Sequence, residues 1–250
     1  MQSLLGLAVA VAMAAMAFVV SPADSAVIFE DNFNGHAADT LLSSYTPPVG
    51  VAYTGPWKII TDGGVGGTDY TGQTTPLDNE QAFISAANTL AVTGQKVQFD
   101  YDYYGNYYLS TGSDFVTFDA GAGGYTGRGW DLMLNGNGSI QYYNKDVGGT
   151  GVVTVAPAGT FAYNAWTHVT VTADYGTHTF DATVGTYGFS GAWEASGGST
   201  FQQLYMAANG TNLFYIDNLS IIQVVPEPAT LMHLGVAALA GMPRRRRPAR

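Results

Sequence analysis

The acidic, basic and nucleophilic side chains of this sequence are few, and their spacing matches no common catalytic motif. Glycoside hydrolysis needs two carboxylates that flank the scissile bond. Between residues 27 and 225, no Glu-x-Asp-x-x-Glu pattern occurs, because the only glutamates are Glu30, Glu80 and Glu194. The chain has no cysteine, so a thiol nucleophile and a thiolate metal site are excluded. The sequence therefore predicts a protein that is not an enzyme, with Asp100 and Asp102 left open as an acid pair.

Aromatic side chains form the second group with chemical potential, at 13% of all residues. Exposed rings beside Asp and Asn suit sugars, which present apolar faces and hydroxyl edges. In a β protein the same rings also fill the core and form cross-strand pairs, and we expect that position for most of them. The candidates for sugar contact are those near Gly and Asn turns: Tyr104, Tyr107, Tyr108 and Trp193.

Charge is distributed unevenly along the chain, whose formal net charge is −10. Upstream of a C-terminal arginine cluster, the only basic residues are Lys58, Lys96, Arg128 and Lys145. Affinity for nucleic acid depends on Lys and Arg that neutralise phosphates, so nucleic-acid binding is not expected. An acidic surface makes divalent cations the more natural partners.

Short apolar-rich runs separated by Gly, Asn, Asp and Thr clusters predict an all-β fold. Runs at this spacing are typical of a two-sheet antiparallel sandwich, and residues 27–225 show no internal boundary. We expect one domain there, with strands at 27–33, 57–61, 81–85, 96–104, 114–119, 129–134, 139–143, 151–155, 166–174, 177–184, 202–207 and 213–222.

Alternation of side chains assigns faces to two of these strands. From Val97 to Tyr103 the odd positions are apolar or aromatic, so Asp100 and Asp102 share the solvent face. In the run 166–174, Val169, Val171 and Ala173 line one face and His168, Thr170 and Thr172 line the other. A turn at 175–176 then leads to a strand of the same pattern, which predicts a hairpin.

The final strand breaks strict alternation. Phe214 and Ile216 share one face, whereas Leu219 and Ile221 would lie on the opposite face. A β-bulge at 217–218 would place all four in the core and turn Asp217 outward. Asp217 and Asn218 would then either serve a ligand or satisfy backbone amides at the bulge.

Both ends of the chain carry features of transport signals. An apolar stretch from Leu4 to Val20, followed by small residues, is typical of a signal peptide over residues 1–26. At the other end, Pro226, Glu227 and Pro228 precede a short apolar run and then an arginine cluster at 244–247. This tail, residues 226–250, resembles the PEP-CTERM sorting signal. The resemblance implies a short hydrophobic helix, cleavage by an exosortase-type membrane enzyme, and the cell surface or extracellular matrix of a Gram-negative bacterium.

The central region resembles concanavalin A-like, laminin-G-type jelly rolls. The phrases that carry the resemblance are residues 29–33, 166–174 with the strand that ends at Gly185, and 214–221. In such domains the first and last strands lie side by side and often hold a structural Ca²⁺. The resemblance therefore names Glu30, Asp31 and Asp217 as candidate calcium ligands, since Ca²⁺ takes oxygen ligands.

Together these features predict an exported surface protein with a structural or adhesive role in an exopolysaccharide layer. The alternative is a lectin-like carbohydrate-binding module, and a glycan-active enzyme is the less favoured third interpretation. An exposed aromatic strip on a concave sheet would favour the lectin-like interpretation.

Overall fold

The computed structural model describes residues 26–44, 51–72, 81–90, 96–106, 112–118, 127–208 and 213–224. Residues 1–25 of the expected signal peptide and the whole expected sorting tail lie outside these ranges, as do Tyr107 and Tyr108. Within the described ranges, no helix is both long and apolar enough to cross a membrane. Residues 26–224 form one compact unit.

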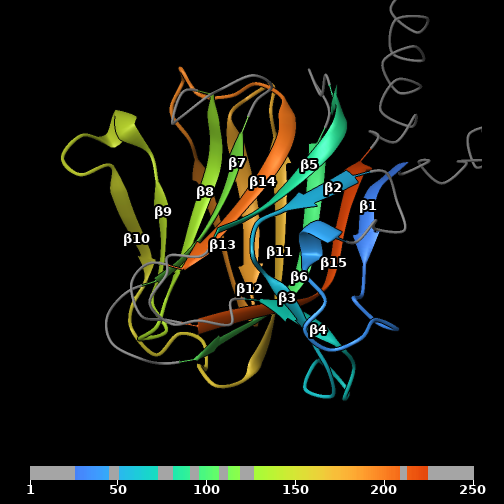
Figure 1. Cartoon of the computed structure of the whole chain (residues 1–250). Helices are drawn as coiled ribbons and strands as arrows, with labels where there is room; N and C mark the ends of the chain where they lie inside the picture. The colour runs from blue at the N-terminus through green and yellow to red at the C-terminus, as the bar shows by residue number, and fades with distance from the viewer. Residues whose placement is uncertain are drawn as a thin grey trace, which may run out of the picture. The chain divides into compact units, whose positions relative to one another are not determined.

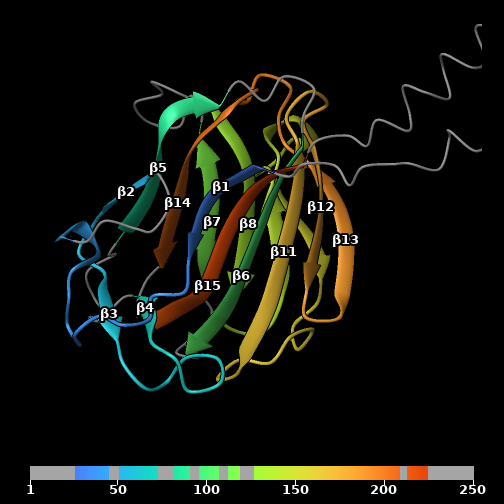
Figure 2. The same cartoon turned by 90° about the vertical axis from the view of Figure 1, so that its right-hand side faces the viewer.

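This unit is a sandwich of two antiparallel sheets (Figure 1). Sheet A contains eight strands, named here in spatial order with β1 also beside β15: β13 (Tyr187–Ala192), β12 (Thr179–Val184), β11 (Trp166–Asp174), β6 (Lys96–Asn106), β15 (Leu213–Val224), β4 (Tyr70–Gly72), β3 (Lys58–Ile60) and β1 (Ala26–Asp31). Figure 2 looks onto the outer face of this sheet.

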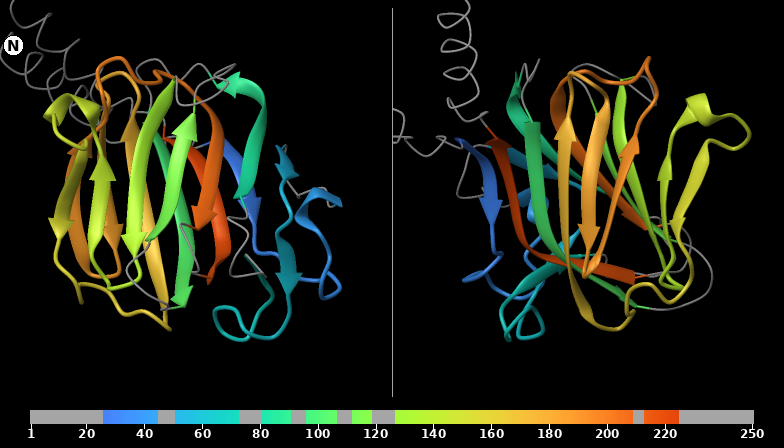
Figure 3. Two further views of the ribbon diagram at one scale, coloured as in Figure 1. Left: turned by 60° about the vertical axis from the view of Figure 1, so that its left-hand side comes forward. Right: turned by 180° about the vertical axis from the view of Figure 1, so that it is seen from behind.

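Sheet B contains seven strands, in the order β10 (Val152–Ala156), β9 (Ile140–Tyr143), β8 (Arg128–Asn135), β7 (Gly112–Phe118), β14 (Phe201–Ala208), β5 (Gln81–Leu90) and β2 (Val51–Thr54). The left view of Figure 3 brings this sheet to the front, with β8 and β9 in yellow-green. Two 3₁₀ turns complete the described elements, η1 (Leu42–Ser44) and η2 (Lys145–Val147). The predicted all-β, two-sheet antiparallel jelly roll is confirmed.

Alternation along the strands builds the core between the sheets. Phe99 and Tyr101 of β6 point inward and are fully buried. Phe99 meets Trp130 of β8 with ring centroids 4.9 Å apart, and Tyr101 stacks on Phe115 of β7 at 4.7 Å. Each such side chain contributes about 1.5–3 kcal/mol through burial. The core therefore fixes which face of β6 is turned to solvent.

The predicted hairpin and bulge are both present. β11 pairs with β12, and the Asp174 carboxylate accepts hydrogen bonds from the backbone N–H groups of Gly176 and Thr177 in the turn. In β15 the register against β6 shifts between Asp217 and Ser220, and Asn218 has a φ of 49°. The four apolar side chains named for this strand are all buried: Phe214, Ile216, Leu219 and Ile221.

Three strands were not predicted from the sequence, namely β2, β4 and β13. β2 and β4 have four and three residues, too few for an alternation to show. β13 contains Gly188 and Gly191, and glycine is depleted in strands. Each of the three forms backbone hydrogen bonds with a strand that the sequence predicts: β2 with β5, β4 with β15 and β13 with β12.

Candidate functional site

The outer face of sheet A carries an aromatic row next to an acidic row. Trp166 of β11 lies opposite Tyr104 of β6, which lies opposite Tyr215 of β15. Two residues along each strand, and so on the same face, His168 lies opposite Asp102 and Asp102 opposite Asp217. The antiparallel register of the three central strands therefore aligns the two rows.

Four partly exposed rings form a cluster that we call the aromatic patch: Tyr70, Tyr104, Trp166 and Tyr215. The ring of Tyr70 meets Trp166 edge-on at 5.6 Å and Tyr215 at 5.2 Å, while Tyr104 lies 5.5 Å from Trp166. The Trp166 Nε1–H donates to the carbonyl oxygen of Gly63 at 3.1 Å, which fixes the indole. The patch is a preorganised apolar surface at the rim of the sheet.

Two phenols of the aromatic patch have raised pKa values. Burial raises the pKa of Tyr70 and of Tyr215, and neighbouring phenols raise both further. Each of these two phenols is therefore a neutral hydroxyl that can donate or accept a hydrogen bond.

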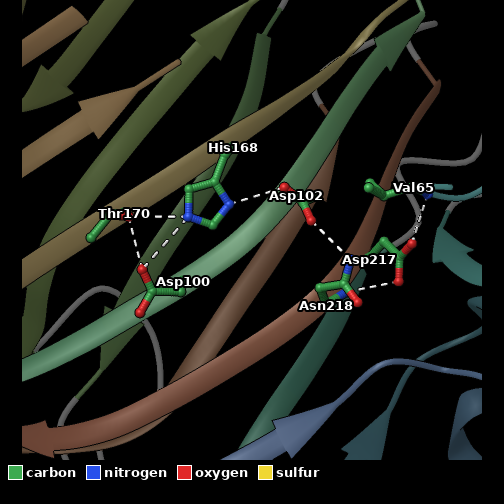
Figure 4. A network of polar contacts seen from close by, with 7 residues as sticks. All are labelled: Val65, Asp100, Asp102, His168, Thr170, Asp217 and Asn218. Carbon is green, nitrogen blue, oxygen red and sulfur yellow. Dashed lines mark hydrogen bonds and ion pairs between the residues drawn. The ribbon is translucent and has the colours of Figure 1, made fainter. Parts of the chain in front are cut away.

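Beside the aromatic patch lies a polar network (Figure 4). Asp102 Oδ1 lies 3.0 Å from His168 Nδ1, and Asp102 Oδ2 accepts from the Asn218 side-chain amide at 2.9 Å. Asp100 accepts from the Thr170 hydroxyl at 2.8 Å and from the Gln98 amide at 2.6 Å. Among the described residues, neither aspartate forms an ion pair with Lys or Arg.

Asp217 holds the loop that precedes β4. Its Oδ2 accepts from the Val65 backbone N–H at 2.9 Å and from the Thr68 hydroxyl at 2.8 Å, and its Oδ1 accepts from the Asn218 N–H at 2.7 Å. Gly64 approaches so closely that a Cβ there would lie 2.5 Å from the Asp217 carboxylate. Burial raises the pKa of Asp217, although these three donors act in the opposite direction.

As expected, Asp217 points out of the sandwich core, yet it is buried because the loop at 61–69 covers it. The Gly-rich composition of that loop is typical of an exposed surface loop, so the sequence did not predict that it would bury Asp217. The loop carries Gly63 and leads into Tyr70, so the carboxylate positions one edge of the aromatic patch.

The three candidate calcium ligands do not form one site. β1 does lie beside β15, with Glu30 opposite Ser220 and Asp31 opposite Leu219. Leu219 is a core residue, so Asp31 faces inward, where it accepts from the Phe33 N–H and the Tyr53 hydroxyl, both at 2.7 Å.

Asp31 and Asp217 therefore lie on opposite faces of sheet A, and Glu30 is exposed. In the described part of the chain, no group of three or more His, Cys, Asp or Glu is arranged to hold a metal ion. Asp217 instead accepts from one backbone amide at the bulge, that of Asn218, and from the Val65 amide of the loop, whereas the Asn218 side chain donates to Asp102.

The predicted sugar-contacting aromatics separate into different environments. Tyr104 belongs to the aromatic patch. Trp193 is only 3% exposed, stacks on His178 at 5.3 Å and donates from Nε1 to the Gly198 carbonyl, so it offers no free ring face. Sequence reasoning missed Tyr70, Trp166 and Tyr215. For Trp166 a signal existed, because it shares the alternation that places His168 on the solvent face.

A second carboxylate cluster lies at β8 of sheet B. Arg128 Nη2 lies 2.6 Å from Asp131 Oδ2, and the guanidinium sits over the Tyr143 ring at 4.4 Å. Asp131 is 2% exposed, and burial raises its pKa to about 7; Arg128 opposes this rise, whereas Asp114 and Glu194 add to it. This cluster is buried and lies apart from the aromatic patch, on the other sheet.

Solved structures resemble this fold at low sequence identity. Peanut lectin with a 9mer peptide is 12% identical, with 81% of this chain and 98% of the lectin covered and a TM-score of 0.54. Lectin I from Ulex europaeus, in complex with the methyl glycoside of α-L-fucose, is 9% identical over 80% of this chain and 98% of that chain, with a TM-score of 0.51.

A carbohydrate esterase from the Shiga toxin-encoding bacteriophage phi24B is 15% identical over 79% of this chain and all of that chain, with a TM-score of 0.50. No family model and no curated protein matches the sequence. The fold is a lectin-like, concanavalin A-like jelly roll. At these identities the likeness establishes the fold alone.

Proposed function

We propose that this protein binds carbohydrate without cleaving it, through the aromatic patch on the outer face of sheet A. The observation that carries the proposal is four partly exposed rings, mutually packed and adjacent to carboxylate and amide side chains. Aromatic faces suit the apolar faces of sugar rings, and the neighbouring polar groups suit hydroxyl edges. The lectin-like fold supports this choice over a purely structural role.

The positions of the acids support binding rather than hydrolysis. Asp100 and Asp102 lie two residues apart on one strand, and every carboxylate oxygen of the pair has a polar partner within the network. Hydrolysis requires one carboxylic acid to protonate the leaving oxygen and a second carboxylate, flanking the scissile bond, to act as the nucleophile or to activate a water molecule. Two carboxylates on the same face of one strand do not provide that arrangement.

Isothermal titration of the full chain with oligosaccharides chosen from a glycan array tests the proposal. Trp166→Ala should weaken binding by about tenfold or more, because a bound sugar would bury the indole and loss of a buried large apolar side chain costs about 1.5–3 kcal/mol. Phe118→Ala is the matched control, since Phe118 is a partly exposed ring of sheet B that pairs with Tyr205. Equal effects of the two substitutions, or oligosaccharide cleavage during the titration, would overturn the proposal.

We also propose that the protein is exported and retained at the surface of a Gram-negative cell, within an exopolysaccharide layer. Support comes from the apolar leader, the Pro226–Pro228 motif and the arginine cluster. Mass spectrometry of the secreted protein should find a new N-terminus near residue 26 and a C-terminus near residue 226. Glu227→Ala should preserve the tail, whereas Pro248→Ala, beyond the arginine cluster, should not. An uncut chain in the cytosol would contradict this proposal.

A further inference from the structure

We propose that the aromatic patch and the aspartates beside it select glycans that carry a protonated amine over glycans that carry a carboxylate. This inference rests on the carbohydrate-binding function proposed above and specifies its ligand class. It follows from the charge and the ring arrangement on the outer face of sheet A.

The first support is negative charge without a Lys or Arg partner. Asp100 and Asp102 lie on the solvent face of β6, and their partners are hydroxyl and amide groups together with the imidazole of His168. The charge of Asp102 also raises the pKa of the buried Asp217 on β15. An arriving cation therefore meets two partly exposed carboxylates that no guanidinium or ammonium of the described residues contacts.

Among the described residues, no Lys or Arg forms an ion pair with these aspartates. Lys58 lies on the same face, in the row of Tyr215 with Gly72 between them, but its ammonium pairs with Asp39 at 3.7 Å. Arg128 pairs with Asp131 of sheet B, and Lys145 lies in η2. Lys96 is on β6, but six residues from Asp102, which is about 20 Å along an extended strand. Lys58, held by Asp39, is therefore the one described basic side chain near the aromatic patch.

The second support is the arrangement of the rings. Aromatic faces carry negative partial charge and attract a cation within about 6 Å of the ring centroid. Trp166 and Tyr104 lie two residues from His168 and Asp102 on the same strand faces. A sugar stacked on these rings can therefore place an amino group against both an aromatic face and the Asp102 carboxylate, whose charge-assisted hydrogen bond is strong.

Three 1,4-linked tetrasaccharides of different charge provide the test: β-linked glucosamine, its N-acetylated counterpart and α-linked galacturonate. The full chain is titrated with each at pH 6 and low ionic strength. We expect the amine form to bind about tenfold more tightly than the N-acetyl form, equivalent to about 1.4 kcal/mol, and the galacturonate to bind most weakly. At high salt the preference should shrink because exposed charges are screened.

Two matched variants test whether the Asp102 carboxylate causes the preference for the amine form. Asp102→Asn keeps the shape of the side chain and should reduce the preference for the amine to about threefold or less. Asp181→Asn removes the same charge from exposed β12 of the same sheet, outside the aromatic patch, and should leave the preference unchanged. Equal effects of both variants would show a general surface attraction and would overturn the inference.

The failure of this inference can be told apart from failure of the proposed function. If the N-acetyl tetramer or galacturonate binds as tightly as the amine form, and Trp166→Ala abolishes that binding, the charge selection is wrong while carbohydrate binding stands. If none of the three sugars nor any glycan of the array binds, both proposals are wrong.

Discussion

The aspartates beside the aromatic patch on sheet A and the buried aspartate of β8 on sheet B differ in exposure and in their partners. On sheet A, the side chains of Asp100 and Asp102 remain 22% and 15% exposed and accept hydrogen bonds from uncharged donors and from His168. On sheet B, Asp131 is 2% exposed and contacts Arg128. Burial with a guanidinium partner indicates a structural role, whereas retained exposure beside the aromatic patch leaves charge available to a ligand.

The largest expected effect comes from breaking the pair on sheet B. Arg128→Met keeps much of the side-chain length but leaves Asp131 buried without a cation, and removing one partner of a buried pair costs about 3–5 kcal/mol. Urea denaturation at pH 8, above the raised pKa of Asp131, followed by fluorescence measures the free energy of unfolding. Lys145→Met, at an exposed position, is the control and should change little. A loss below about 1 kcal/mol for Arg128→Met would show that Asp131 is accessible to water.

A pH effect on stability should come next. Because burial raises the pKa of Asp131 from its ordinary 3.8 to about 7, the folded state retains a proton between these values that the unfolded state has lost. Its contribution to stability is full below about pH 4 and is lost as the pH rises to about 7, with a slope of at most about 1.4 kcal/mol per pH unit.

Urea midpoints measured between pH 4 and 8 test this sign. Asp131→Asn should flatten the pH dependence across that interval, whereas Asp181→Asn, at an exposed position, should retain the slope of the parent protein. An unchanged slope in Asp131→Asn would assign the titration to another group and weaken the contrast between the two sheets.

The smallest effect should come from the network on sheet A. His168 is 59% exposed and lies 3.0 Å from Asp102, and exposed pairs of this kind stabilise a protein by less than about 1 kcal/mol. His168→Ala should therefore leave the melting temperature within a few degrees of the parent value by calorimetry. A loss as large as that of Arg128→Met would mean that the network holds sheet A together, and its assignment as a ligand surface would need revision.

Local patterns predicted the faces of individual strands. Alternation in β6 and β11 placed Asp100, Asp102 and His168 on the solvent side, and the irregularity in β15 predicted the bulge at Asp217. These features depend on residues near each other in the sequence. The apposition of β1 and β15 came from the resemblance to jelly rolls, and the structure contains it.

Pairing between distant strands was beyond sequence reasoning. The aromatic patch joins residues 70, 104, 166 and 215, whose proximity depends on the order β11-β6-β15-β4. Without that order, the sequence did not single out Trp166 within its strand. It instead named Trp193 as a candidate for sugar contact, although Trp193 is buried against Tyr175 and His178. Proximity to a turn does not decide exposure when the turn packs back onto the sandwich.

The position of β15 has a consequence for how the chain reaches its native state. This last strand pairs with β6 on one side and with both β1 and β4 on the other. A polypeptide synthesised from its N-terminus therefore lacks the partner of its first strand until residue 224 has emerged. Contacts of such sequence separation slow folding, so sheet A is completed late, and a chain lacking β15 should be unable to close the sandwich.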